Sequence, residues 1–175
     1  MPLLKNNTLI ADTWTHAEAE GALPSNDVVV PFSRLLKEWQ QLAQRDGKLG
    51  VSLGNVDRAE ALSTFLPKLQ LIVLTFPAFN DGRAYSIARQ LRQMGYRGEL
   101  RATGNVLPDQ LQFMLQVGFD TFDIGERFSL ATWQQASKLM SLAYQRGLYR
   151  RAGEAEIWTE RHTDAEPWLE QPHAG

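Results

Sequence analysis

The chain has 175 residues, of which 43% are hydrophobic and 22% charged, and its formal net charge is −2. This composition is typical of a globular domain with a core of its own, and it gives no support for a nucleic-acid partner. The absence of cysteine excludes disulfides, thiol catalysis and cysteine-ligated metal centres. No apolar run reaches the ~18 residues of a membrane helix, and the N-terminus lacks the apolar segment of a signal peptide, so we expect a cytoplasmic protein without a membrane partner.

The first 26 residues are expected to form a short arm with an edge strand or hairpin in residues 8–16. Residues 27–147 alternate between apolar runs typical of buried strands and amphipathic patterns typical of helices, and they are predicted to form one α/β domain. The expected strands occupy residues 27–32, 49–53, 71–76, 99–103 and 119–124. The helical patterns begin near Ser33, Asp57, Asp81, Pro108 and Ser129.

This alternation predicts five parallel βα units in a doubly wound, flavodoxin-like sheet. A partial βα barrel is the alternative, because the pattern alone does not separate an open sheet from a curled one. The run from Leu71 to Phe76 is apolar throughout. We therefore expect it to be the central strand, buried on both faces.

The last segment, residues 148–175, is predicted to be an acidic, flexible tail. From Gly153 onward it holds six acidic residues and one arginine. Trp158 and Trp168 interrupt the polar sequence. They either cover the parent domain or anchor the tail to a partner, since tryptophan contributes strongly to interface energies.

Several common signatures are missing from the chain. It has no glycine-rich dinucleotide or nucleoside-triphosphate loop. Its histidines, His16, His162 and His173, lie outside the βα core, which disfavours a Ser–His–acid triad and a histidine-rich metal site. We predict no cofactor and no metal, and the sequence identifies no catalytic residue.

The polar residues that follow the strands suggest an anion site instead, because ligands of α/β sheets bind at the carboxyl ends of the strands. Asp81, Gly82 and Arg83 open a helix, whose free N–H groups and positive dipole end attract anions. A guanidinium at that position suits sulfate, sulfite, phosphate or carboxylate. Arg101 and Asn105 belong to the next strand and its end, and we expect them to converge with Arg83 on a common rim.

Tyr85, Asp109 and Gln110 are weaker candidates for the same site. Structural roles compete with binding: Asp81 is a suitable helix cap, and an acid and an amide are favoured in a first helical turn. Arg101 could equally form a buried ion pair with Asp81 or Asp109. Three further arginines are expected to form a solvated helix face: Arg89, Arg92 and Arg97.

Residues 76–86 read FPAFNDGRAYS, and they are followed by Ala88-Arg89, Leu91-Arg92, Gly98-Glu99-Leu100-Arg101-Ala102, Gly104, Asp109-Gln110 and Gly118-Phe119-Asp120. This succession, over roughly residues 49–142, resembles a bacterial family of unknown function. Its members are encoded beside the genes for assimilatory sulfite reductase and phosphoadenylylsulfate reductase, and some are labelled oxidoreductases. Asn105 departs from the family pattern, where an acid is common, which puts a catalytic role for it in doubt.

The resemblance implies a role in sulfur assimilation. We expect an accessory protein of sulfate and sulfite reduction that acts through protein interaction, with sulfite reductase or another enzyme of that pathway as its partner. The alternative is an enzyme or carrier that binds a sulfur oxyanion or a phosphorylated small molecule at Arg83 and Arg101. An oxidoreductase, suggested by the family label alone, is the third hypothesis.

Overall fold

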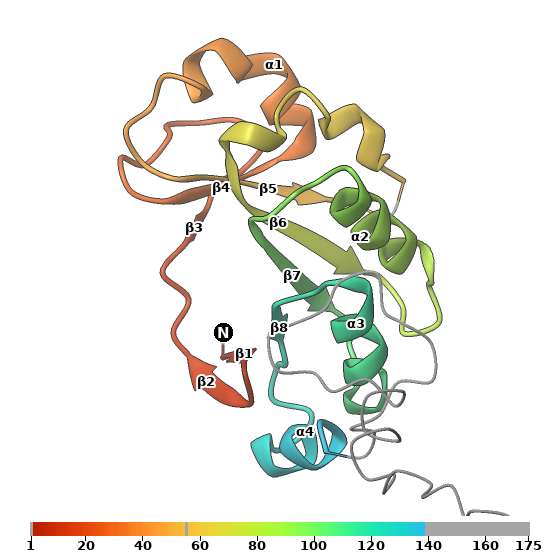
Figure 1. Ribbon diagram of the computed structural model, residues 1–175. Helices are drawn as coiled ribbons and strands as arrows, with labels where there is room; N and C mark the ends of the chain where they lie inside the picture. Colours follow the sequence, from red (N-terminus) through yellow and green to blue (C-terminus); the bar gives the residue numbers. More distant parts are fainter. Residues whose placement is uncertain (1, 55, 139–175) are drawn as a thin grey trace, which may run out of the picture.

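The computed structural model describes residues 2–54 and 56–138 (Figure 1). Within them an eight-stranded sheet curls into an open half-barrel, and four α-helices cover its outer face. The strands are β1 Leu3–Lys5, β2 Thr8–Ile10, β3 Thr15–His16, β4 Val28–Pro31, β5 Leu49–Leu53, β6 Leu69–Phe76, β7 Glu99–Gly104 and β8 Thr121–Asp123. The α-helices are α1 Phe32–Leu42, α2 Arg83–Gln93, α3 Leu111–Val117 and α4 Leu130–Ala136.

The order of the strands decides between the two predicted folds. The sheet runs β2-β1-β8-β7-β6-β5-β4-β3, with β3 to β8 parallel and the β1–β2 hairpin antiparallel at one edge. From β4 to β8 each new strand is added on the same side of the previous one, whereas a doubly wound sheet reverses direction at a switch point. The flavodoxin-like prediction is therefore wrong, and the partial-barrel alternative fits.

One of the five expected βα units lacks its α-helix. Between β5 and β6 the chain forms two 3₁₀ turns, η1 Ala59–Leu62 and η2 Leu66–Lys68. The Asp57 carboxylate accepts the Gly54 N–H at 2.7 Å instead of capping a helix. Pro67 lies within η2, and its missing N–H and its ring oppose a continuous α-helix there.

Strand β6 is central and buried on both faces, as predicted. Ile72, Leu74 and Phe76 point to the outer face and join the main core under the helices. Leu71 and Val73 point to the inner face, where Trp14 packs on them. This arrangement explains the apolar run, because residues 71–74 are buried whichever face of the sheet they point to.

Local end signals also act as expected at two helices. Gly118 ends α3 in the left-handed conformation, with φ of 108°, which glycine adopts without steric cost. The Ser129 hydroxyl caps α4 by accepting the Thr132 N–H at 3.3 Å. These two residues set the bounds of the helices that lie beyond β7 and β8.

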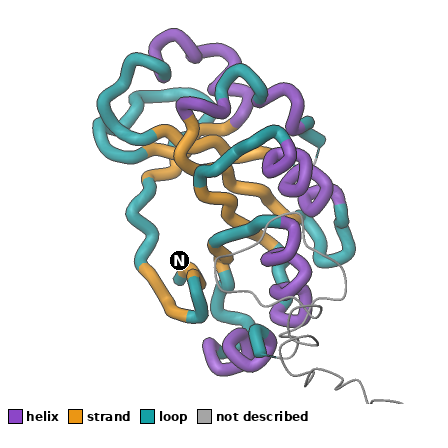
Figure 2. The backbone as a smooth tube through the Cα atoms, viewed as in Figure 1, coloured by secondary structure: helices purple, strands orange, loops and turns teal. Residues whose placement is uncertain are grey.

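The N-terminal arm forms a hairpin over residues 3–10, not within the predicted residues 8–16, and the chain then crosses the inner face of the sheet. The β1–β2 hairpin lies beside β8, whereas β3 pairs with β4 at the opposite edge. The connecting residues 11–14, called the strap below, therefore pass over the face that the helices leave uncovered (Figures 1 and 2).

No helix in residues 2–54 and 56–138 is both long enough and apolar enough to cross a membrane.

Candidate functional site

The structure divides the predicted site residues between two places. Most of them lie around the loop of residues 77–82, which joins β6 to α2 beyond the carboxyl ends of β6 and β7. Arg101, by contrast, projects from the middle of β7 onto the inner face of the sheet.

Two side-chain amides hold the loop of residues 77–82 in place. Asn105 donates from Nδ2 to the Pro77 carbonyl at 2.6 Å, and its backbone N–H donates to the Phe76 carbonyl at 2.8 Å. Gln110 donates from Nε2 to the Phe79 carbonyl at 2.7 Å. Asn105 and Gln110 therefore have a structural task at this rim, because they satisfy carbonyl groups that no strand or helix pairs.

The start of α2 carries its own anion. Gly82 occupies the N-cap position, and the Asp81 carboxylate accepts the backbone N–H of Arg83 at 3.1 Å. The same carboxylate pairs with the Arg83 guanidinium through Nε at 2.9 Å and Nη2 at 2.7 Å. Asp81 thus supplies the negative charge that a helix N-terminus attracts, while the Arg83 side chain stays 58% exposed.

Aromatic rings extend from the core to the surface beside this loop. The rings of Phe76 and Tyr85 lie 5.1 Å apart, and those of Tyr85 and Phe113 lie 4.9 Å apart. Phe113 is 53% exposed and Phe79 is 57% exposed. Burial, followed by the charge of Asp109, raises the pKa of Tyr85 to about 12. The region therefore presents the exposed ring of Phe113 beside a phenol that stays protonated at neutral pH, and a second exposed ring, Phe79, on the loop of residues 77–82.

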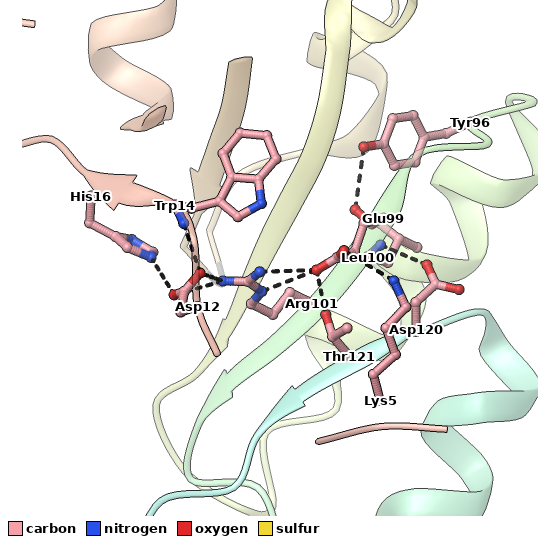
Figure 3. Close-up of polar contacts among 10 residues, drawn as sticks. All are labelled: Lys5, Asp12, Trp14, His16, Tyr96, Glu99, Leu100, Arg101, Asp120 and Thr121. Atoms are coloured by element: carbon pink, nitrogen blue, oxygen red, sulfur yellow. Dashed lines mark hydrogen bonds and ion pairs between the residues drawn. The ribbon is translucent and has the colours of Figure 1, made fainter. Parts of the chain in front are cut away.

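Arg101 is the centre of an ion-pair network on the inner face (Figure 3). Its side chain is only 4% exposed. Nη1 donates to both oxygens of Asp12 at 3.0 Å, and Nε and Nη2 donate to Glu99 at 3.3 and 3.0 Å. Glu99 also accepts from Thr121 at 2.7 Å and pairs with Lys5 at 3.6 Å. All three guanidinium nitrogens of Arg101 are thus bound within the chain.

The Asp12 carboxylate fastens the strap to this network. It accepts the Trp14 N–H at 3.1 Å and lies 3.6 Å from His16. Burial alone would raise its pKa, but the hydrogen bonds from Trp14 and Arg101, with the charges of Arg101 and His16, lower it below the ordinary value of 3.8. Asp12 therefore stays ionised in the folded protein at neutral pH.

Arg83 and Arg101 do not share a rim. Helix α2 packs on the outer face of the sheet, whereas Arg101 lies on the inner face. Arg101 does form a buried ion pair, the alternative to ligand binding, but its partners are Asp12 and Glu99, and the named partners Asp81 and Asp109 are wrong. Glu99 could have been found, because residues two apart on a strand share a face. Asp12 is 89 positions away in the chain, and no local pattern points to it.

The family model described as "Bacterial protein of unknown function (DUF934)" matches residues 50–153. The chain belongs to this family. The match confirms the resemblance seen in the sequence, and it includes the rim and Arg101 but not the strap. No match to the chain was found among curated proteins or among solved structures.

Arg92, within the part shared with the family, is another residue whose predicted position, on a solvated helix face, is wrong. Instead of facing solvent it is 8% exposed, and it donates to the carbonyls of Gly118, Tyr96 and Gly98. It also pairs with Asp120 at 2.6 Å. Helical spacing carried the signal, since Arg92 lies four residues after the buried Ala88. Arg89 and Arg97 are exposed, as expected.

The remaining predicted site residues are not placed. Trp158 and Trp168 lie outside the described residues, and their docking role stays a prediction. Within residues 2–54 and 56–138, no group of three histidines or acids is arranged to hold a metal ion.

Proposed function

We propose that this protein is an accessory protein of assimilatory sulfate and sulfite reduction, and that it acts by binding sulfite reductase or another enzyme of that pathway. The pathway follows from the gene neighbourhood of the family that the chain resembles. The interaction role is supported by one observation: both arginines predicted to bind an oxyanion already hold carboxylates of the same chain.

An oxyanion at Arg101 would have to displace Asp12 or Glu99 from a guanidinium that is 4% exposed. Breaking a buried ion pair costs about 3–5 kcal/mol, since it leaves a charge without its partner. At the start of α2 the Asp81 carboxylate already accepts the N–H of Arg83. Arg101 therefore offers no ready set of donors for a further anion, and at the start of α2 a carboxylate of the chain already occupies the position of the anion.

The second candidate function is an enzyme or carrier for a sulfur oxyanion or a phosphorylated small molecule. The exposed guanidinium of Arg83 favours it, since Asp81 engages Nε and Nη2 while the side chain remains largely in solvent. An oxidoreductase activity rests on the family label alone and has no further support.

Affinity purification of the tagged full-length protein from its native cell, followed by mass spectrometry, tests the first proposal. We expect sulfite reductase or another sulfate-assimilation enzyme to co-purify, and the purified pair to bind in isothermal titration calorimetry. Recovery of no enzyme of this pathway would contradict the proposal.

Thermal unfolding with sulfite, sulfate or phosphate separates the two candidates. The interaction role predicts no change in Tm at millimolar anion. A rise in Tm for the wild-type protein that disappears in Arg83→Ala would instead favour the oxyanion carrier. Arg89→Ala is the matched control, because Arg89 is an exposed arginine of the same helix.

A further inference from the structure

We propose that the partner docks on the aromatic rim, defined as Phe79, Tyr85, Phe113 and Asp109. The partner would receive the aromatic side chains in an apolar pocket of its own that has a basic side chain at its edge. This inference rests on the proposed function. It adds the surface that makes the contact and the chemistry that the partner presents.

The rim contains two exposed phenyl rings, and one of them is connected to the core through ring contacts. Gln110 binds the backbone of Phe79 and lies three positions before Phe113 in the sequence. Phe113 in turn packs on Tyr85, whose ring contacts the buried Phe76. The rings of Tyr85 and Phe113 are therefore joined to each other and supported from below, while Gln110 ties the backbone of Phe79 to the turn that precedes Phe113. Exposed aromatic side chains are the usual anchors of protein interfaces.

The rim is also preorganised. Hydrogen bonds from Asn105 and Gln110 fix the carbonyls of Pro77 and Phe79, so the loop that carries Phe79 is held at both points. A partner that binds here would not have to order this part of the backbone. Binding to a surface that is already fixed avoids much of the entropic cost of association.

The charge of the rim favours a different protein over a second copy of this chain. Asp109 is exposed and forms no ion pair with any residue among 2–54 and 56–138, whereas neighbouring Asp81 and Arg83 neutralise each other. A two-fold contact of the rim with itself would bring like patches together, and with them the two Asp109 carboxylates. A lysine or arginine beside the pocket of the partner would instead complement Asp109.

Calorimetric titration of the full-length protein with purified sulfite reductase tests the surface. We expect Phe79→Ala and Phe113→Ala each to weaken binding about tenfold or more, as interface anchors do. Asp109→Asn should weaken binding several-fold and reduce its dependence on salt. Leu36→Ala is the matched control, because Leu36 is 53% exposed, like Phe113, but lies on α1 near the opposite end of the sheet (Figure 1).

The outcomes separate this inference from the proposed function. If the wild-type protein does not bind any sulfate-assimilation enzyme, both fail. If it binds and both phenylalanine variants bind equally well while Trp158→Ala or Trp168→Ala abolishes binding, the rim is overturned and the accessory role stands.

Two measurements on the free proteins complete the test. Each variant must melt close to the wild-type Tm, which we expect because Phe79 and Phe113 are exposed. In analytical ultracentrifugation, the free wild-type protein should not form a dimer through the rim, which would be recognised by its dissociation in Phe113→Ala. Such a dimer would overturn the inference in favour of a second copy.

Discussion

At the scale of single residues, the phenol of Tyr85 reports the electrostatics of the rim. Its pKa is about 12, first because the ring is partly buried and second because Asp109 is negatively charged. Replacing Asp109 by Asn removes the second cause and leaves the first. We therefore expect the pKa of Tyr85 in Asp109→Asn to fall but to remain above 10, the ordinary value for tyrosine.

Carbon-13 NMR of tyrosine-labelled protein during a pH titration measures this shift directly. Asp46→Asn serves as the control, since Asp46 is an exposed acid on the α1–β5 loop and does not act on Tyr85. Equal pKa values of Tyr85 in the wild type and in Asp109→Asn would show that Asp109 is farther from the ring than the structure places it.

The same shift has a consequence for stability in alkali. Because the pKa of Tyr85 is higher in the folded than in the unfolded protein, its stabilising contribution is complete below pH 10 and is lost as the pH rises from 10 toward 12. Tyr85→Phe should therefore lose less stability than the wild type over this interval. Burial also raises the pKa of Tyr96, so part of the alkaline sensitivity remains in that variant.

At the scale of elements, the end of β7 is fixed by the close approach of two backbones. Gly104 has φ of 91°, and a Cβ at this position would lie 2.4 Å from the Phe76 carbonyl oxygen of the neighbouring strand. Gly104→Ala must therefore strain the left-handed backbone and also push β7 away from β6. We expect it to lower the free energy of unfolding by about 3 kcal/mol.

Urea denaturation at neutral pH checks this expectation against Gly125→Ala. Gly125 also has a positive φ, 53°, but a Cβ there would meet nothing within 4 Å. Only the backbone strain of about 1 kcal/mol then applies. Equal losses in the two variants would show that the contact between Gly104 and Phe76 is not tight.

The elements also show which features of the fold the sequence could predict. Strand β6, the end of α3 at Gly118 and the cap of α4 at Ser129 were predicted correctly, because each depends on residues within one turn or one strand. The solvent-exposed position predicted for Arg92 is wrong, although its spacing from Ala88 is that of a residue on the buried face of α2. A charged residue at the edge of an apolar stripe can be either exposed to solvent or buried, and the sequence does not decide between the two until the partners of the residue are known.

The arrangement of the elements was less accessible than the elements themselves. A strand–helix alternation is the same whether the strands are added in one direction or in two, so the sequential order of β4 to β8 could not be read from it. The candidate site failed for a similar reason. Arg101 is held by Asp12, which lies in another element and 89 positions away.

At the scale of the whole molecule, the strap closes the inner face of the half-barrel. It joins the β1–β2 hairpin beside β8 to β3 beside β4, so the N-terminal arm supplies the strands at both edges of the sheet. Trp14 packs on Val29, Leu71 and Val73, which would otherwise form an apolar surface on the inner face. The arm is therefore part of the folding unit, and the ion pair of Asp12 with Arg101 is one of its polar attachments.

This attachment predicts how the stability of the whole fold depends on acid. The pKa of Asp12 lies below 3.8 in the folded protein because Trp14 and Arg101 stabilise the carboxylate more than burial destabilises it. A lowered pKa contributes stability that is complete above the unfolded value and disappears as the pH falls through the folded one. The contribution of Asp12 should therefore be full above about pH 4 and lost below it.

Asp12→Asn should consequently unfold more easily than the wild type at pH 7, by about 2 kcal/mol, since it loses a charge-assisted bond to a buried guanidinium. The difference should shrink as the pH falls below 3.8, because the carboxylate takes up a proton there in the unfolded wild type and at lower pH in the folded protein. Guanidinium denaturation between pH 3 and 7 measures both quantities, and Glu60→Gln, an exposed acid on η1, is the control. A difference that stays constant down to pH 3 would mean that Asp12 acts through the shape of the strap and not through its charge.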